Sequence, residues 1–291
     1  MARIIKWLLA ALVLAALLLW PLTRPLSFSF GDLPEYIPDP VNGEQVLLTG
    51  GCQSCHGEDL AGGVELTSEF GTFLAPNISP DPDTGIGGWT TLDMVNAMML
   101  GTSPDGRHFY PAFPYPSYTR MKVQDVIDLK AYIDSLEPVE NRVGPNDLHF
   151  PWSVRRGIGL WKLVFLKQGP VVEAELADPE WQRGRYLVEG AGHCGECHTP
   201  RNALGGPRLS AWLAGGANPD GEGQVPNITP HGNGLKAWSA DDIVYYLESG
   251  FTPEFDTVGG SMVKVQEHLS RLPRSDLRAI AAYLKSIPAV P

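Results

Sequence analysis

Two short stretches, CQSCH at Cys52–His56 and CGECH at Cys194–His198, decide how the rest of the sequence is interpreted. Each is a C-x-x-C pair followed at once by histidine, and together they use all four cysteines of the chain. This pattern is the attachment signature of a c-type haem. Two thiols bond to the vinyl groups at one edge of the porphyrin, and the adjacent histidine ligates the iron from the proximal side.

Other uses of four cysteines are a disulfide framework, with three possible pairings, or a zinc site. The histidine after both pairs, with no cysteine left over, favours two covalently bound haem c groups. The predicted attachment residues are Cys52, Cys55, Cys194 and Cys197, and the predicted proximal iron ligands are His56 and His198.

An apolar segment at the N-terminus indicates export. Residues 4–22 read IIKWLLAALVLAALLLWPL, with Lys6 as the single charge. A bilayer span takes about 20 apolar residues, and the basic residues at its start keep that end in the cytoplasm. A cleaved signal peptide is the alternative, although no A-x-A-like site follows the run. We predict a membrane anchor in residues 1–30, in the inner (cytoplasmic) membrane, with the haem domains in the periplasm.

The body of the chain is an internal repeat. APNISP at 75–80 matches VPNITP at 225–230, and Trp89 and Trp238, each opening a helical stretch, stand 149 residues apart. Both halves close with apolar residues at helical spacing. The pattern predicts an all-α fold after an N-terminal transmembrane helix. Its two tandem domains are expected at residues 31–140 and 178–291, with a connector at 141–177.

Composition limits the partners. The 291 residues include 33 acidic and 22 basic ones, for a formal net charge of −11. Nucleic acid is therefore excluded as a partner, because phosphate binding needs a concentrated basic surface. Residues 31–140 hold 17 acidic and 4 basic side chains, which favours a basic electron-transfer partner for the first domain. The apolar run at 157–166 is expected to pack between the domains, with the membrane interface as the alternative.

Three longer stretches carry a family resemblance: PNISPDPDTGIGGWT at 76–90, PDGRHFYPAFPYPSYTRM at 104–121 and GHCGECHTPRNALGG at 192–206. With them the sequence resembles the cytochrome c subunits of membrane-bound bacterial alcohol and gluconate dehydrogenases, across nearly the whole body. The resemblance implies class I cytochrome c domains and an electron-transfer subunit. Those subunits usually carry three haem sites, whereas this sequence has two.

The sixth iron ligands are sought among the methionines, because a thioether raises the reduction potential relative to a second histidine. Met262 is the methionine that follows the second motif, between a Gly-rich loop and the last helical stretch, and we predict it as a ligand. A buried core methionine is the alternative. In the first half, the residue 151 positions before Met262 is Pro111, in the methionine-free YPAFPY. Met121 is predicted there by elimination and because the related cytochromes carry a methionine at that place. His108 and a methionine of the 89–101 stretch remain alternatives.

Supporting roles are expected for a few further residues. The carbonyl of Pro200 is expected to accept a hydrogen bond from the ring of His198. Candidates for hydrogen bonds to the haem propionates are Asn77, Trp89, Asn227, Trp238 and Arg201; helix packing and Asx turns are the alternative roles.

The predicted function is that of a membrane-tethered dihaem electron carrier, not an enzyme. Electrons would pass from a periplasmic dehydrogenase towards a quinone, another cytochrome or a terminal oxidase of the respiratory chain. The alternatives are a dihaem enzyme such as a peroxidase, which needs an open distal position, and a haem-containing structural subunit.

Overall fold

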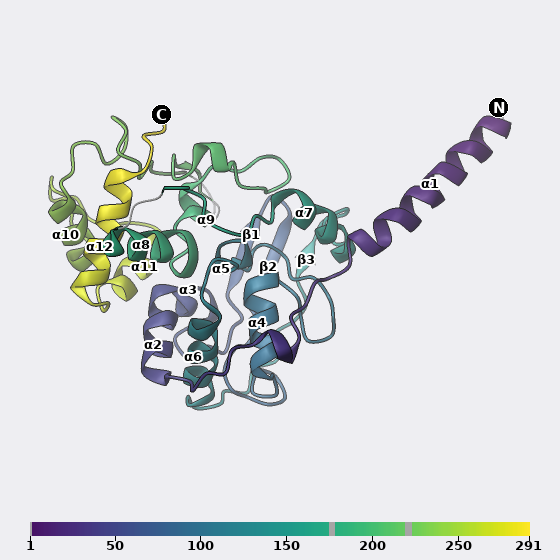
Figure 1. The fold of residues 1–291 in the computed structure, drawn as a ribbon, viewed down its shortest axis with the longest axis horizontal. Helices are drawn as coiled ribbons and strands as arrows, with labels where there is room; N and C mark the ends of the chain where they lie inside the picture. The colour runs from purple at the N-terminus through teal and green to yellow at the C-terminus, as the bar shows by residue number, and fades with distance from the viewer. Residues whose placement is uncertain (1, 175–177, 219–222) are drawn as a thin grey trace.

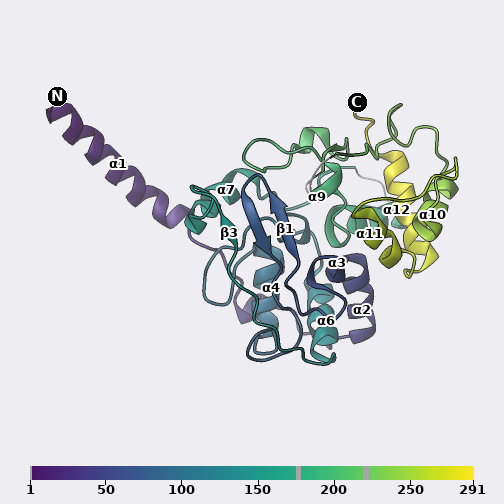
Figure 2. The same ribbon diagram turned by 180° about the vertical axis from the view of Figure 1, so that it is seen from behind.

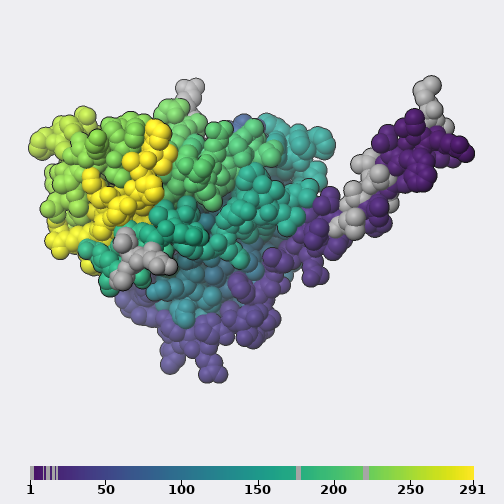
Figure 3. Space-filling view, turned by 45° about the horizontal axis from the view of Figure 1, so that its top comes forward, coloured from purple at the N-terminus to yellow at the C-terminus, as the bar shows by residue number. Residues whose placement is uncertain are grey.

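The computed structural model describes residues 2–174, 178–218 and 223–291, without some side chains of the first helix. That helix, α1 (Ala2–Leu22), stands clear of the body of the molecule (Figures 1 and 3). The body contains a first unit, defined as α2 to α6, and a second unit, defined as α8 to α12. Each unit contains one of the two C-x-x-C-H motifs.

Within the described part of the chain, no helix is both long and apolar enough to cross a membrane. The membrane span predicted at residues 4–22 is therefore not confirmed, and part of it falls on side chains outside the description. At its C-terminal end α1 is attached to the body. The guanidinium of Arg156 stacks 4.3 Å from the centre of the Trp20 ring and donates to the Trp20 carbonyl.

The first unit is helical and is closed at one side by a small sheet. Its helices are α2 (Pro40–Thr49), α3 (Cys52–His56), α4 (Thr91–Leu100), α5 (Tyr115–Tyr118) and α6 (Val123–Asp134), preceded by the short η1 (Phe30–Asp32). Its antiparallel sheet is made of β1 (Glu65–Ser68), β2 (Gly71–Leu74) and β3 (Asp147–Leu148), in that order.

The second unit has the same arrangement of helices, with a smaller, two-stranded sheet. Its helices are α8 (Pro179–Tyr186), the π-helical η3 (Leu187–Ala191), α9 (Gly195–His198), η4 (Leu209–Ala211), α10 (Ala240–Ser249), α11 (Met262–Leu269) and α12 (Arg274–Ser286). Two residue pairs form its antiparallel ladder, between β4 (Gly216–Ala217) and β5 (Gln224–Val225).

A close crossing of the first and last helices builds both units, and a glycine permits each crossing. A Cβ on Gly43 of α2 would lie 2.1 Å from the carbonyl oxygen of Asp128 in α6. A Cβ on Gly184 of α8 would lie 1.9 Å from the carbonyl oxygen of Ala279 in α12. Since no side chain larger than hydrogen fits at such distances, both helix pairs depend on glycine at the crossing.

The helix after each APNISP-like loop begins in the same way in both units. Thr90 and Asp93 form a reciprocal capping box at the start of α4, and Ser239 and Asp242 form the same box at the start of α10. Such boxes satisfy two backbone donors that a helix start leaves without partners. The capping residues thus fix where the core-facing surface of each helix begins.

The helical class predicted from the sequence is confirmed, but the small sheets were not predicted. Strands of two to four residues are too short to show an alternating pattern. The third strand, β3, also comes from the segment predicted as connector and pairs with β2 more than seventy residues earlier. No local sequence signal reveals such a pairing.

The segment between the units forms η2 (Arg155–Gly157) and α7 (Ile158–Phe165), close to the base of α1 (Figures 1 and 2). The Lys162 ammonium donates to the carbonyl of Gly101 in the first unit, and the Trp161 indole donates to the carbonyl of Leu204 beyond α9. The segment therefore packs against both halves of the body, as the sequence led us to expect. Leu163 on its outer side remains exposed.

Candidate haem sites

The histidines of the two motifs are held by the same hydrogen bond. His56, at the end of α3, has Nδ1 2.7 Å from the carbonyl oxygen of Pro76. His198, at the end of α9, has Nδ1 2.8 Å from the carbonyl oxygen of Pro226. Because a carbonyl oxygen only accepts, Nδ1 is the donor in both rings. This tautomer leaves the Nε2 lone pair of each imidazole for a metal.

The electrostatic setting also favours neutral imidazoles. Burial lowers the pKa of both His56 and His198, while the bond to the carbonyl opposes the shift. A neutral ring whose second nitrogen is anchored to a carbonyl is the usual state of a metal-ligating histidine. Both rings therefore fit the role of a proximal iron ligand.

The predicted partner of His198 was wrong. The carbonyl of Pro200 accepts from the backbone N–H of Arg208 instead, 2.9 Å away. The acceptors are the first prolines of the matching PNISP and PNITP stretches, Pro76 and Pro226. The two prolines stand at matching places in the repeats, and this match was the sequence signal that could have identified them. Because they act through backbone carbonyls, no side-chain motif marks their role.

The four cysteines lie on or directly beside the same short helices, all within the described part of the chain. Cys52 begins α3 after Gly51, whose φ of 55° is left-handed, and Cys194 directly precedes α9. Burial raises the pKa of the Cys52 thiol to about 12 and that of Cys194 to about 11. No disulfide joins any of the four.

The predicted methionine ligands lie in or against the apolar cores on which the motif cysteines pack. Met121 is buried between α5 and α6, in the cluster against which Cys52 packs. Met262 begins α11 and packs, partly buried, against the cluster that Cys194 contacts. The methionines of α4 are buried in the first core, as expected for packing residues: Met94, Met98 and Met99.

The asparagines and tryptophans considered for propionate binding have structural partners. Asn77 donates to the Val139 carbonyl at 2.7 Å, and Asn227 donates to the Val290 carbonyl at 2.7 Å. Each Asn oxygen accepts from the backbone two residues later, as in an Asx turn. Trp89 and Trp238 pack against the two hydrophobic cores. The alternative structural roles account for all four.

Arg201, the remaining propionate candidate, is engaged within the second motif. Its guanidinium pairs with the carboxylate of Glu196 and donates to the carbonyl of Gly205 at 2.8 Å. It therefore holds the loop after α9 against the motif helix.

A tryptophan that the sequence did not point to, Trp212, packs on the second motif. A Cβ on Gly195 would lie 2.1 Å from the Trp212 ring, so only glycine fits at this position of α9. The Trp212 indole donates to the Tyr283 hydroxyl at 3.1 Å, which donates to the buried Glu189 carboxylate at 2.6 Å. This buried chain of hydrogen bonds connects the motif to α12 and η3.

The sequence is similar to those of several known cytochromes. The Cytochrome c family model matches residues 40–137. The chain is 52% identical over 288 residues to a "Diheme cytochrome c-type" protein of Cereibacter sphaeroides, covering 96% of both chains. It is 40% identical to an "Alcohol dehydrogenase (quinone), cytochrome c subunit" of Gluconobacter oxydans, spanning 91% of this chain and 59% of that subunit. It is 36% identical to a "Gluconate 2-dehydrogenase cytochrome c subunit" of Pantoea cypripedii, over 85% of this chain and 59% of that subunit.

The geometry and the comparisons agree on the cofactor. Two thiol pairs each stand beside a histidine whose Nδ1 is bound to a carbonyl, which is the donor set that haem c requires. The Cereibacter sphaeroides relative, matched over 96% of both chains, is a dihaem protein by name. The chain therefore belongs to the dihaem c-type cytochromes and carries two covalently bound haem c groups.

Proposed function

We propose that the two C-x-x-C-H motifs each hold one haem and that the chain is an electron-transfer protein, with no substrate chemistry of its own. The observation that carries the proposal is the anchoring of His56 and His198 on the carbonyls of Pro76 and Pro226, repeated in both units. When bound, haem c supplies an iron that accepts and returns one electron. The protein supplies the ligands and the apolar surroundings.

The residues of each unit have separate roles in this proposal. Cys52 with Cys55, and Cys194 with Cys197, form the thioether bonds. Met121 and Met262 give the sixth ligand in this proposal. The first cysteine of each motif packs against an apolar cluster; Met121 belongs to the first cluster, and Met262 packs against the second. A thioether ligand and a buried site both favour the ferrous state and so raise the reduction potential.

The electron donor in this proposal is a periplasmic dehydrogenase, and the acceptor is a component of the respiratory chain. Support comes from the relatives, which include cytochrome c subunits of alcohol and gluconate dehydrogenases. A fructose dehydrogenase cytochrome subunit of Gluconobacter japonicus is 38% identical over 87% of this chain.

The donor is tested on the protein isolated from its own membranes together with any bound subunits. Ethanol, gluconate and fructose are added in turn, and the α-band of reduced haem is followed. We expect one of them to reduce both haems through a stoichiometric dehydrogenase subunit. A chain that purifies alone and is reduced by none of the three contradicts the proposed donor.

Carbon monoxide separates the carrier from the peroxidase alternative. A haem with His and Met ligands has no open position, so the reduced spectrum of the holoprotein should not change under carbon monoxide. A Met121→Ala or Met262→Ala variant should bind the gas at one haem. Binding by the unaltered protein, together with turnover of hydrogen peroxide, would support the enzyme instead.

We also propose that α1 attaches the protein to the inner membrane, with the haem units in the periplasm. Support comes from the apolar sequence of residues 4–22 and from exposed Trp7 and Trp20 near the two ends of the helix. The test compares membrane pellets of the full chain and of a variant that lacks residues 2–22, both washed with high salt. Release of the full chain by salt alone would overturn this attachment.

A further inference from the structure

One side chain connects the two haem-binding segments. His193 directly precedes Cys194, and its Nε2 lies 2.9 Å from the carbonyl oxygen of Gly50, two residues before Cys52. Nε2 is the donor, because the carbonyl only accepts. A short path therefore joins the first cysteines of the two motifs. It runs from Cys52 through Gly51 to Gly50, crosses the hydrogen bond to His193, and reaches Cys194.

The backbone of His193 is in a conformation that favours glycine. Its φ is +39°, and the matching position before Cys52 is Gly51, with φ +55°. Both units therefore need a left-handed residue directly before the first cysteine. A histidine is strained there while glycine is not, so contacts of its side chain must offset the strain.

Those contacts all reach into the first unit. Besides the bond to Gly50, the His193 ring packs edge-on against Tyr118, with 5.5 Å between ring centres and an angle of 80°. Tyr118 is buried in the cluster against which Cys52 packs. The imidazole is thus held from two sides in a fixed orientation between the two motifs.

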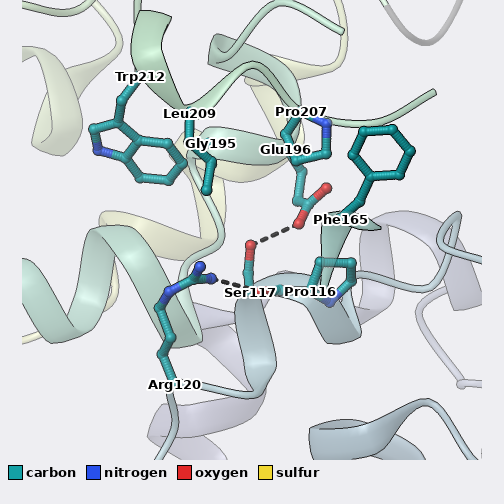
Figure 4. A pocket seen from close by; sticks show the side chains of 9 residues that line it. All are labelled: Pro116, Ser117, Arg120, Phe165, Gly195, Glu196, Pro207, Leu209 and Trp212. Carbon is teal, nitrogen blue, oxygen red and sulfur yellow. Dashed lines mark hydrogen bonds between the residues drawn. The ribbon is translucent and has the colours of Figure 1, made fainter. Parts of the chain in front are cut away.

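The surrounding interface does not depend on His193. Beside it, the Ser117 hydroxyl of α5 donates to the Glu196 carboxylate at 2.6 Å, within the second motif (Figure 4). Two exposed ion pairs join the second unit to the first at the edge of this interface. Lys264 of α11 pairs with Glu58 at 3.2 Å, and Arg271, in the turn after α11, pairs with Glu44 at 3.5 Å. The two units should therefore stay together when the His193 side chain is removed.

We propose that His193 is a positioning residue that fixes the spacing of the two haem-binding segments and thereby sets the rate of electron exchange between the units. This inference rests on the proposed function, in which each motif holds a haem. In each exchange one unit is oxidised and the other is reduced by one electron, with no bond made or broken and no proton transferred.

The test uses the full chain carrying both haems, with His193→Ala and His193→Gln variants. A light pulse with a ruthenium sensitiser delivers one electron, and its equilibration between the units is followed by absorbance. Circular dichroism in the Soret region reports the relative orientation of the two haems. We expect His193→Ala to slow equilibration severalfold and to weaken the paired Soret signal. His193→Gln, whose side-chain amide can donate to Gly50, should restore most of both.

Two controls separate positioning from general damage. Arg271→Ala loosens the same interface at its exposed edge and should leave the rate unchanged. Both reduction potentials should stay at their unaltered values in His193→Ala, because neither iron ligand is touched. Unaltered kinetics and Soret signal in His193→Ala would overturn the inference, and so would equal slowing in the Ala and Gln variants. Failure of the proposed function would instead appear in the unaltered chain, as a motif without haem.

Discussion

The two units of this cytochrome match on the proximal side of the motif and differ on the opposite side. Both anchor the motif histidine on a proline carbonyl, cross their first and last helices at a glycine, and start the middle helix with a capping box. Before the closing helix, the first unit has the four-residue α5 and the second has the eight-residue α11. The structure around the motif histidine is thus nearly the same in both units, whereas the segment in which we propose the sixth ligand differs between them.

The position of the methionines shows this divergence most clearly. Met262 lies at the start of α11, four residues after Val258, whose N–H bonds to the Gly250 carbonyl. The matching bond in the first unit joins Phe109 to Gly101, so the equivalent of Met262 is Phe113. Met121 lies at the end of the corresponding segment instead. The two sixth ligands that we propose therefore lie at opposite ends of the segment that precedes the closing helix of each unit.

The largest effect expected to test the likeness of the two units is the loss of one haem. Cys52→Ala or Cys194→Ala removes one thioether, and the haem of that unit should be lost or bound through a single bond. The α-band of the reduced protein should fall by half in the case of loss, because the other unit keeps its own anchored histidine. Gln53→Ala, at a motif position without attachment chemistry, is the control. Loss of both haems from one substitution would show that the units do not assemble independently.

The next effect concerns the sixth ligands. Met262→His and Met121→His should each lower the potential of one haem and leave the other nearly unchanged, because a second imidazole favours ferric iron more than a thioether does. The red charge-transfer band of Met–iron bonding should halve in each variant and vanish in the double variant. Spectroelectrochemical titration measures both.

Met98→Leu, in the buried α4, serves as the matched control for these substitutions and should change neither potential nor band. If Met121→His behaves like Met98→Leu, the assignment of Met121 is wrong. His108 would not replace it readily, because His108 Nε2 is 2.8 Å from the carbonyl oxygen of Thr23 and its ring is buried there.

A smaller effect tests the helix crossings. Gly43→Ala and Gly184→Ala each force a methyl group against backbone atoms, and such overpacking costs about 1–3 kcal/mol of unfolding free energy. Both variants should melt at lower temperature to a similar extent. Gly157→Ala, where no heavy atom lies within 4 Å of the added carbon, should not. A strong effect in one unit only would mean that the two crossings differ in tightness.

The smallest effect is a pH dependence of stability that arises where Lys162 of α7 contacts the first unit. Burial lowers the pKa of Lys162, which caps the carbonyls at the end of α4, to about 7. An unfolded lysine titrates near pH 10.4, so between about pH 7 and 10 the unfolded state binds more protons and stability rises with pH. Urea midpoints should show this rise, and Lys162→Met should remove its share. Lys236→Met, which removes an exposed lysine, is the control and should keep the rise of stability with pH. An unchanged rise in Lys162→Met would contradict the lowered pKa of Lys162.

The sequence alone predicted the features that depend on side-chain identity and short spacing. The motifs, the repeat and the helical class follow from residues such as Cys52, Trp89 and their counterparts. The acceptors of the motif histidines were missed because Pro76 and Pro226 act through backbone carbonyls. The β2–β3 pairing and the contact of His193 with Gly50 join residues far apart in the chain, and no local pattern encodes such contacts.

Mass spectrometry of peptides from the purified full chain measures directly whether both motifs hold a haem. After proteolysis, the peptide with Cys52 and Cys55 and the peptide with Cys194 and Cys197 should each carry the mass of one haem. Neither should be found with free thiols or joined by a disulfide. A second-motif peptide without haem, beside a fully modified first-motif peptide, would contradict the equivalence of the two units.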